Sequence, residues 1–297
     1  MPPLSSVDFP KEQAHFGTEA LTAGLDNALD LDRCTTADPH VTTALLLAAG
    51  EGSRLLSRTN GGPKCLTDVC GIPILGRLVS CLVQEGFERL VVVVGHRGEQ
   101  IRDYLELHAG GLQIHCIDCH KYATTNNIYS LWLARKHIRE PVLLIESDLV
   151  FESRLLGLMR TSNRIAVARL RSNMHGTTVS FDDSGRVRSF RVGAVNGTRL
   201  AYKTVNLYSL SLPLWQEVSR RLEQRIAAGK VDDYYEVVFA DMAAERSLPL
   251  QAVYFDDGRW CEIDTPDDLF DAEQLFSAFE RNGGPRVLTG SVHLDPA

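Results

Sequence analysis

Residues 43–55 read Thr-Ala-Leu-Leu-Leu-Ala-Ala-Gly-Glu-Gly-Ser-Arg-Leu, and this stretch decides the fold. Thr43–Ala49 is a continuous apolar run that ends at Gly50, a pattern typical of a strand buried on both faces of a parallel sheet. The small residues and Gly52 let backbone N–H groups approach an anion closely. We therefore predict a phosphate-binding loop at the carboxyl end of a parallel strand.

On the carboxyl side of this loop, short apolar runs alternate with segments in which apolar residues recur at helical spacing. We predict strands over 90–94, 112–117, 141–145 and 165–170, and helices over 75–83, 99–107 and 126–138. The first helix ends near Gly86, a residue suited to a helix C-terminus. This alternation predicts an α/β fold with a Rossmann-like, doubly wound, mostly parallel sheet.

The pattern changes after residue 170. Two apolar segments, 177–181 and 187–192, flank a turn at Gly185 and predict an antiparallel hairpin inserted into the fold. We then expect a strand over 204–210, helices over 214–228 and 234–246, a strand over 250–255, and a helix over 266–279 with Thr265 near its N-cap.

The ends and the composition restrict the class of protein. Residues 1–40 are expected to be an N-terminal extension, partly disordered or helical, followed by one domain over 41–282 and a tail over 283–297. The chain shows neither a signal peptide nor an apolar run of the ~20 residues that span a bilayer, so we expect a cytoplasmic protein without membrane insertion. Seven cysteines, with one isolated pair at Cys116 and Cys119, suit a reduced protein better than a zinc site.

The net charge of −7 argues against a nucleic-acid groove, because phosphate backbones require a basic face. A homodimer is compatible with this sequence, which leaves the oligomeric state open.

Two common phosphate loops are also excluded. Leu55 stands where a dinucleotide loop requires its third glycine, and Cys65 follows Lys64 where a P-loop requires serine or threonine.

Leu47–Leu55, followed by Pro63 and Lys64, resembles the signature of the nucleotidyltransferase superfamily, which includes sugar-nucleotide pyrophosphorylases and cytidylyltransferases. Later motifs resemble those of bacterial phosphocholine and 2-aminoethylphosphonate cytidylyltransferases, across about residues 43–277. These motifs are Thr125–Leu131, Glu146–Phe151, Tyr202–Tyr208, Asp233–Glu236 and Trp260–Pro266. The resemblance implies a nucleotidyltransferase fold similar to that of GT-A enzymes. Glu146 and Ser147 before Asp148 do not fit the D-x-D motif of glycosyltransferases with a similar fold.

The resemblance implies a Mg²⁺-dependent enzyme that transfers CMP from CTP to a small phosphonate or phosphate acceptor, similar to 2-aminoethylphosphonate or phosphocholine, and releases pyrophosphate. The preference for CTP rests on the resemblance alone. Three alternatives stay open: a sugar-1-phosphate nucleotidyltransferase that makes an NDP-sugar, a CTP:inositol-1-phosphate cytidylyltransferase, and a nucleotide-binding regulatory module without catalysis.

The resemblance also implies a Mg²⁺ site at Asp148 and Asp264, and carboxylates are ligands that Mg²⁺ prefers. Either residue could instead serve a turn or a helix start. We expect Arg54 to stabilise the departing pyrophosphate, and Lys64 to neutralise charge on the α-phosphate or the acceptor. Lys203 is a second candidate cation near the acceptor, with an exposed strand lysine as its alternative.

The remaining candidates fall into two groups. Those expected to bind the nucleotide are Leu47, Ala48, Ala49, Gly50, Gly52, Ser53, Asn126, Asn127 and Ser147, although helix capping would explain at least one asparagine. Those expected to bind the acceptor are Asp233, Tyr235, Glu236 and Trp260. Aromatic faces suit a quaternary ammonium and carboxylates suit a primary one. Both kinds are present, so the sequence leaves this choice open.

Overall fold

The computed structural model describes residues 40–52, 55, 61–170, 174–193 and 201–281. Contacts divide the chain into Met1–Thr36 and Ala37–Ala297, and every described residue belongs to the second unit. The extension predicted over 1–40 falls outside the described residues except for its last residue, and the tail predicted over 283–297 falls outside them entirely. The domain boundaries proposed at 40 and 282 therefore stay a prediction.

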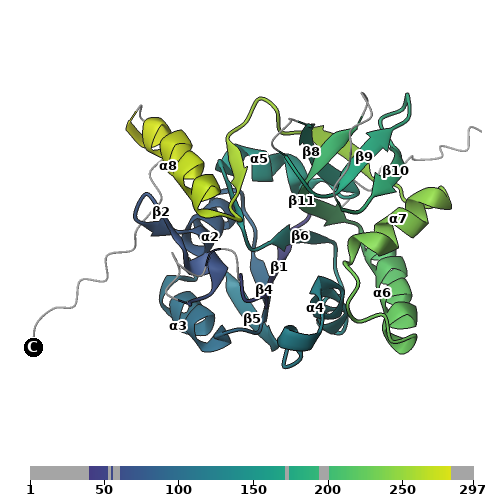
Figure 1. The fold of residues 1–297 in the computed structure, drawn as a ribbon, viewed down its shortest axis with the longest axis horizontal. Helices are drawn as coiled ribbons and strands as arrows, with labels where there is room; N and C mark the ends of the chain where they lie inside the picture. Colours follow the sequence, from purple (N-terminus) through teal and green to yellow (C-terminus); the bar gives the residue numbers. More distant parts are fainter. Residues whose placement is uncertain (1–39, 53–54, 56–60, 171–173, 194–200, 282–297) are drawn as a thin grey trace, which may run out of the picture. The chain divides into compact units, whose positions relative to one another are not determined.

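A nine-stranded sheet forms the centre of the described unit, with the order β10-β9-β11-β6-β1-β4-β5, while β8 pairs with β11 and β12 (Figure 1). The strands are β1 (Thr43–Ala48), β4 (Arg89–Val94), β5 (Gln113–Asp118), β6 (Val142–Glu146), β8 (Arg164–Arg169), β9 (Thr178–Phe181), β10 (Val187–Arg191), β11 (Tyr202–Leu210) and β12 (Gln251–Tyr254). β1 pairs in parallel with β4 and β6, and β4 with β5, whereas β11 is antiparallel to β6, β8 and β9. The predicted α/β sheet with an antiparallel hairpin insertion is confirmed.

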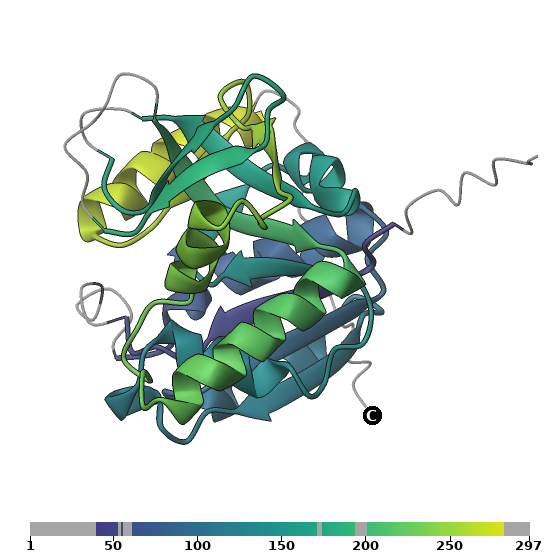
Figure 2. The same ribbon diagram turned by 90° about the vertical axis from the view of Figure 1, so that its right-hand side faces the viewer.

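Helices cover both faces of this sheet. They are α2 (Ile74–Gln84), α3 (Gly98–His108), α4 (Asn127–Ala134), α5 (Ser153–Gly157), α6 (Leu212–Ala227) and α7 (Glu236–Ala244), whereas α8 (Pro266–Arg281) packs against residues outside this sheet. Successive side chains of β1 alternate between the faces. Leu45 and Leu47 pack with residues of α4, α6 and α7, while Ala44 and Leu46 pack with residues of α2, α3 and α5. Figure 2 shows α6 lying across the first of these faces. Burial on both sides explains the uninterrupted apolar run in β1.

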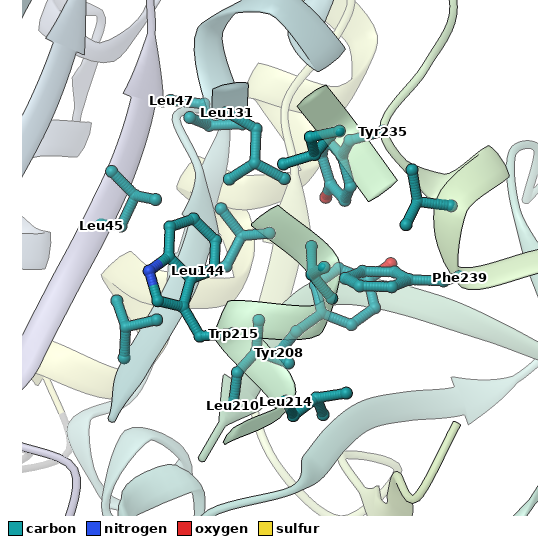
Figure 3. Close-up of a cluster of buried hydrophobic side chains, with 14 of the residues drawn as sticks. Leu45, Leu47, Leu131, Leu144, Tyr208, Leu210, Leu214, Trp215, Tyr235 and Phe239 are labelled. Carbon is teal, nitrogen blue, oxygen red and sulfur yellow. The ribbon is translucent and has the colours of Figure 1, made fainter. Parts of the chain in front are cut away.

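An aromatic cluster holds α6 and α7 against the sheet (Figure 3). The ring of Tyr208 on β11 lies 5.0 Å from that of Phe239 on α7, and the ring of Tyr235 lies 5.7 Å from Phe239. Trp215 on α6 donates its indole N–H to the carbonyl of Ile138 at 3.3 Å. These packed rings fix the start of α7 relative to β11, and both elements carry candidate site residues.

Two small strand pairs and three short 3₁₀ turns complete the described fold. The paired strands are β2 (Asp68–Val69) with β3 (Ile72–Pro73) and β7 (Leu149–Phe151) with β13 (Trp260–Glu262), and the turns are η2 (Lys64–Leu66), η3 (Tyr122–Thr124) and η4 (Leu158–Arg160). The β7–β13 pair is antiparallel and brings the turn after β6 beside the segment that precedes α8. Neither pair is predicted from the sequence.

Two predicted helices are shorter than expected. The helix predicted over 126–138 is α4, Asn127–Ala134. It starts after Asn126, whose side chain accepts from the Asn127 amide at 2.8 Å, and it ends at Ala134, after which the chain forms a turn with the His137 amide donating to the Ala134 carbonyl at 2.9 Å. The helix predicted over 234–246 begins at Glu236. Gly86 and Gly185 adopt positive φ angles of 73° and 74°, as a helix end and a tight turn require. No helix within the described ranges combines the length and apolar character that crossing a membrane requires.

Candidate active site

The first centre of the site joins Lys64, which opens η2, to two carboxylates that are distant in sequence. The Lys64 ammonium lies 2.9 Å from Asp148 Oδ2 and 2.5 Å from Asp264 Oδ1. The three side chains are largely buried. One predicted catalytic lysine and both predicted metal ligands therefore lie together, and we call these three residues the Lys64 centre.

Local hydrogen bonds hold the two carboxylates in place. Asp148 lies in the turn between β6 and β7, and its carbonyl accepts from the Ile263 amide at 2.9 Å. The Asp268 carboxylate accepts from the amides of Asp264 and Thr265 at 3.0 and 2.8 Å, and the Asp268 amide donates to the Thr265 hydroxyl at 3.2 Å. This reciprocal pattern is a capping box at the start of α8, so the helix cap also fixes the neighbouring Asp264.

Charge keeps Lys64 protonated in this centre. Burial alone would lower the pKa of Lys64, but the charges of Asp148 and Asp264, together with their hydrogen bonds, raise it above its ordinary value. Asp148 Oδ1 is buried and has no hydrogen-bond partner among the described residues. A buried carboxylate oxygen without a donor can accept one from a ligand, or can coordinate a cation.

The glycine-rich loop lies against the Lys64 side chain. Gly52 has a φ angle of 61°, and a Cβ added there would lie 3.0 Å from the Cβ of Lys64. A Cβ added at Gly50 would meet no atom within 4 Å. Leu47, Ala48 and Ala49 are buried, so only the backbone of this stretch is suited to binding a nucleotide. Ser53 and Arg54, which belong to the same loop, lie outside the described residues.

A second lysine lies on β11, and it is not the exposed strand residue considered from the sequence. Lys203 is only 3% exposed, and its ammonium lies 2.9 Å from Glu262 Oε2 on β13. The same ammonium donates to the Thr204 carbonyl at 3.0 Å. Asn206 has a left-handed backbone, with a φ angle of 57°, within an irregularity of the β11–β8 pairing, and it donates to Glu262 Oε1 at 3.4 Å. The irregular strand thus turns a polar side chain toward the site.

Two further glutamates lie near Lys203 and Glu262, and we call Glu146, Glu236 and Glu262 the carboxylate cluster. Burial raises the pKa of Glu236 to about 7, partly opposed by the charge of Lys203. Burial, followed by the charges of Asp148 and Glu236, raises the pKa of Glu146 well above its ordinary value. Glu236 Oε2 has no hydrogen-bond partner in the described part of the chain. The cluster therefore gathers three carboxyl groups beside the ammonium of Lys203, and one of their oxygens is left for a ligand.

Asn127 connects this cluster to the helices. Its side-chain N–H₂ donates to Glu146 Oε1 at 3.3 Å, and its carbonyl oxygen accepts from the Tyr235 amide at 3.0 Å. The charge of Asp148 acts on both Glu146 and Glu262, after the dominant effect of burial. The Lys64 centre and the carboxylate cluster are thus neighbouring parts of one charged site.

Several predicted residues lie elsewhere or serve another purpose. Asp233 forms an ion pair with Arg225 on α6 at 2.7 Å, and the Tyr235 ring is fully buried in the aromatic core (Figure 3). Asn126 caps α4, Ser147 is half-buried beside Asp148, and Trp260 packs against the core beneath β7 and β13. Asp233 and Tyr235 thus already have contacts within the protein, and their role as acceptor contacts stays a prediction.

Asn206 was missed as a candidate, and Glu146 was named only as part of a motif. One signal was available for Asn206, because an asparagine interrupts the apolar strand sequence Thr204-Val-Asn-Leu. Asparagine tolerates the left-handed conformation better than most residues, so its presence in a strand indicates an irregularity. Glu146 ends the buried strand β6, where the carboxyl ends of parallel strands commonly face ligands.

Comparison with known proteins shows which proteins this chain is similar to. Residues 44–208 match the MobA-like NTP transferase domain. The chain is 33% identical over 258 residues to CMP-5′-(3-aminopropyl)phosphonate synthase of Streptomyces rubellomurinus, an alignment that covers 82% of this chain and 40% of the relative. It is 30% identical over 215 residues to 2-aminoethylphosphonate cytidylyltransferase of Lancefieldella rimae, covering 71% of this chain and 85% of the relative.

Among solved structures, CTP:phosphocholine cytidylyltransferase from Streptococcus pneumoniae has a similar fold, with a TM-score of 0.66 and 20% identity. This likeness covers 80% of the present chain and all of the other. The resemblance inferred from the sequence motifs is confirmed. The chain belongs to the MobA-like NTP transferase family of nucleotidyltransferase enzymes.

Proposed function

We propose that this protein transfers CMP from CTP to a small phosphonate or phosphate acceptor with a cationic end, and releases pyrophosphate. The observation that carries this proposal is the proximity of two unlike parts of one site. The Lys64 centre combines a cation with two carboxylates beside a glycine-rich loop, and the neighbouring cluster holds three carboxyl groups, of which Glu236 Oε2 has no hydrogen-bond partner in the described residues. The names of the two aligned relatives support CTP and a phosphonate acceptor.

The proposed reaction uses an acceptor that is already anionic near neutral pH, since a phosphate monoester has a second pKa near ~6. An acceptor oxygen attacks the α-phosphorus of CTP, and the bond from that phosphorus to the bridging oxygen of pyrophosphate breaks. No proton has to be removed from the nucleophile. Lys64 neutralises charge on the reacting phosphates, and backbone N–H groups near Gly50 and Gly52 hold the triphosphate. Arg54 stabilises the departing pyrophosphate.

Asp148 and Asp264 would hold Mg²⁺ in this proposal. Their carboxylate oxygens are the hard ligands that this ion prefers, and buried Asp148 Oδ1 has no hydrogen-bond partner in the described ranges. No three His, Cys, Asp or Glu side chains of the described residues form a metal-binding group, so phosphate and water oxygens would complete the coordination shell. The bound ion would neutralise charge on the nucleotide phosphates.

The carboxylate cluster favours a primary ammonium as the cationic end of the acceptor. Such a group donates three hydrogen bonds, which suits the unpartnered Glu236 Oε2 and the acidic surroundings of Glu146. A trimethylammonium donates none and is bound best by exposed aromatic faces. Tyr208 and Tyr235 are instead closed within the core. We therefore propose that the acceptor is an aminoalkyl phosphonate rather than phosphocholine. We also propose that the enzyme is cytoplasmic; either a monomer or a homodimer is compatible with the proposed reaction.

The test is pyrophosphate release in the presence of Mg²⁺, with each of the four NTPs against four acceptors. These acceptors are 2-aminoethylphosphonate, phosphocholine, inositol-1-phosphate and glucose-1-phosphate. We expect release with CTP and 2-aminoethylphosphonate, and much less with phosphocholine. Preferred turnover of glucose-1-phosphate with UTP or dTTP would instead assign the protein to the sugar-nucleotide branch. Nucleotide binding without any turnover would contradict the proposed reaction for these acceptors.

A further inference from the structure

The ammonium of Lys64 occupies the position from which a cation can contact both Asp148 and Asp264. Its nitrogen lies 2.9 Å from Asp148 Oδ2 and 2.5 Å from Asp264 Oδ1. A Mg²⁺ ion bound to the same two oxygens would lie at about 2.0–2.1 Å from each. An ammonium and a divalent ion cannot share these oxygens, because they would occupy overlapping space and repel each other. Metal binding therefore requires Lys64 to leave at least one carboxylate.

We propose that Lys64 is an exchangeable counterion, which holds the two carboxylates in the nucleotide-free protein and yields them to a divalent metal when a triphosphate offers the ammonium a new anionic partner. This inference rests on the proposed function. It makes metal binding and nucleotide binding cooperative. The metal provides a cation for the two carboxylates, and the triphosphate provides an anion for the displaced Lys64 ammonium. By thermodynamic linkage, the metal and the nucleotide must raise each other's affinity by the same factor.

The charge balance of the centre supports this exchange. Lys64 contributes one positive charge against two carboxylates, so the centre attracts cations even while the lysine is present. A metal ion that arrived alone would leave the Lys64 ammonium partly buried and without an anion, which is costly. A triphosphate removes this cost, since the glycine-rich loop lies directly beside the Lys64 side chain.

The surroundings of Lys64 place a new anionic partner within reach. Its side chain is 12% exposed and the two carboxylates are 18% and 24% exposed, so a small part of each reaches solvent. Its stem packs closely against Gly52, since a Cβ added there would lie 3.0 Å from the Lys64 Cβ. The phosphate-binding loop therefore lies directly beside the lysine that would leave the carboxylates.

The test uses Mn²⁺ as the metal probe and a CTP analogue with a non-hydrolysable α,β-methylene bridge. Electron paramagnetic resonance titrations measure the Kd for Mn²⁺ with and without the analogue, and calorimetry measures the Kd for the analogue with and without Mn²⁺. We expect each ligand to tighten the other by an equal factor of about 5- to 150-fold. If the analogue binds but the Kd for Mn²⁺ is the same with and without it, the exchange is overturned and the proposed function stays intact. Failure of the analogue and of CTP to bind would overturn both.

A variant assigns the effect to the lysine. In Lys64→Met, both carboxylates lose their counterion, so Mn²⁺ alone should bind about 5- to 150-fold more tightly than in the wild type. The coupling to the nucleotide should shrink accordingly. Arg89→Met is the matched control. It removes a cation that is paired with Glu140 at the amino ends of the parallel strands, away from the Lys64 centre, and it should leave Mn²⁺ binding unchanged. Equal Mn²⁺ affinity in Lys64→Met and the wild type would overturn the proposal. Lys64→Ala removes the same ammonium and provides the same comparison if Lys64→Met does not fold.

Discussion

The site contains two lysines in opposite situations. Lys64 lies on a short turn between the glycine-rich loop and α2, is 12% exposed, and contacts two carboxylates. Lys203 lies within β11, is 3% exposed, and is held by one carboxylate and one backbone carbonyl. The same residue type thus gives a cation that can change partners and a cation that is locked in place.

The difference follows from the elements that carry the two residues. Lys64 follows a loop at the carboxyl end of β1, where a parallel sheet leaves room for ligands. Lys203 lies opposite Ala168 of β8 and Thr178 of β9, so neighbouring strands confine it. Under the proposed exchange, the parallel half of the sheet would provide a mobile charge for the nucleotide, while the antiparallel half holds Glu262 through its ion pair with Lys203.

The strongest test of this contrast is the effect of Lys64→Ala on turnover. We expect kcat for CMP transfer to fall about 10²- to 10³-fold, the usual cost of removing one group that stabilises developing charge. The fold should persist, because the residue lies on a three-residue turn outside the main sheet and helices. Steady-state kinetics and the far-UV circular dichroism spectrum measure both effects, with Arg89→Ala as a control for loss of a cation elsewhere. A wild-type kcat in Lys64→Ala would remove Lys64 from catalysis.

Lys203→Met should act mainly on stability. Removing one partner of a buried ion pair leaves Glu262 without its counterion and should lower the free energy of unfolding by about 3 kcal/mol. Urea denaturation of Lys203→Met and Lys64→Met measures the contrast directly. Lys64→Met should cost clearly less, since its centre is more exposed. Equal losses in the two variants would contradict the division between a locked and an exchangeable lysine.

The part of the site that the sequence could predict is the part made by local pattern. The apolar run of β1, the glycines that follow it and Lys64 lie within a short segment, so backbone preferences and burial explain them together. Asp148 and Asp264 were also predicted, but through resemblance. Their meeting depends on the pairing of β7 with β13, two three-residue strands that are too short to produce a periodic signal.

The carboxylate cluster shows why the sequence predicted only part of the site: Glu236 is among the predicted acceptor contacts, whereas Glu146 appears only within a motif. Glu146, Glu236 and Glu262 come from three separate elements, and their proximity arises from packing of the aromatic core and the irregularity at Asn206. The general preference of glutamate for the protein surface predicts that each of these residues is exposed to solvent. The ion pair of Asp233 was not predicted either, because its partner Arg225 lies on the preceding helix and no local pattern reveals that pair.

The carboxylate cluster should also make stability depend on pH. Burial holds the pKa of folded Glu236 at about 7, above its ordinary value of 4.5, so the folded protein binds more protons than the unfolded chain between these values. Stability from this residue is therefore full below pH 4.5 and falls as the pH rises through 7. Glu236→Gln should gain on the order of 2 kcal/mol relative to the wild type at pH 8, and little at pH 5.

Urea denaturation at the two pH values measures this change. Glu217→Gln is the control, because hydrogen bonds from Arg220 and Arg221 lower the pKa of exposed Glu217 to about 2. The stability that Glu217 contributes is lost only as the pH falls toward 2. The difference in free energy of unfolding between Glu217→Gln and the wild type should therefore be the same at pH 5 and pH 8. If Glu236→Gln and the wild type had the same pH dependence, Glu236 would not hold its proton through burial.

The smallest expected effect tests how firmly Lys203 is held. Gly176 has a φ angle of 112°, and a Cβ added there would lie 3.1 Å from the Lys203 ammonium and 3.2 Å from its Cε. Gly185 has a φ angle of 74°, and a Cβ added there would meet no atom within 4 Å. Both alanine variants carry backbone strain of about 1–2 kcal/mol, but only Gly176→Ala also presses on the ion pair with Glu262. Thermal unfolding should therefore show Gly176→Ala to be less stable than Gly185→Ala by about 1 kcal/mol. Equal losses would mean that the Lys203 side chain moves aside freely, and the contrast with Lys64 would then rest on burial alone.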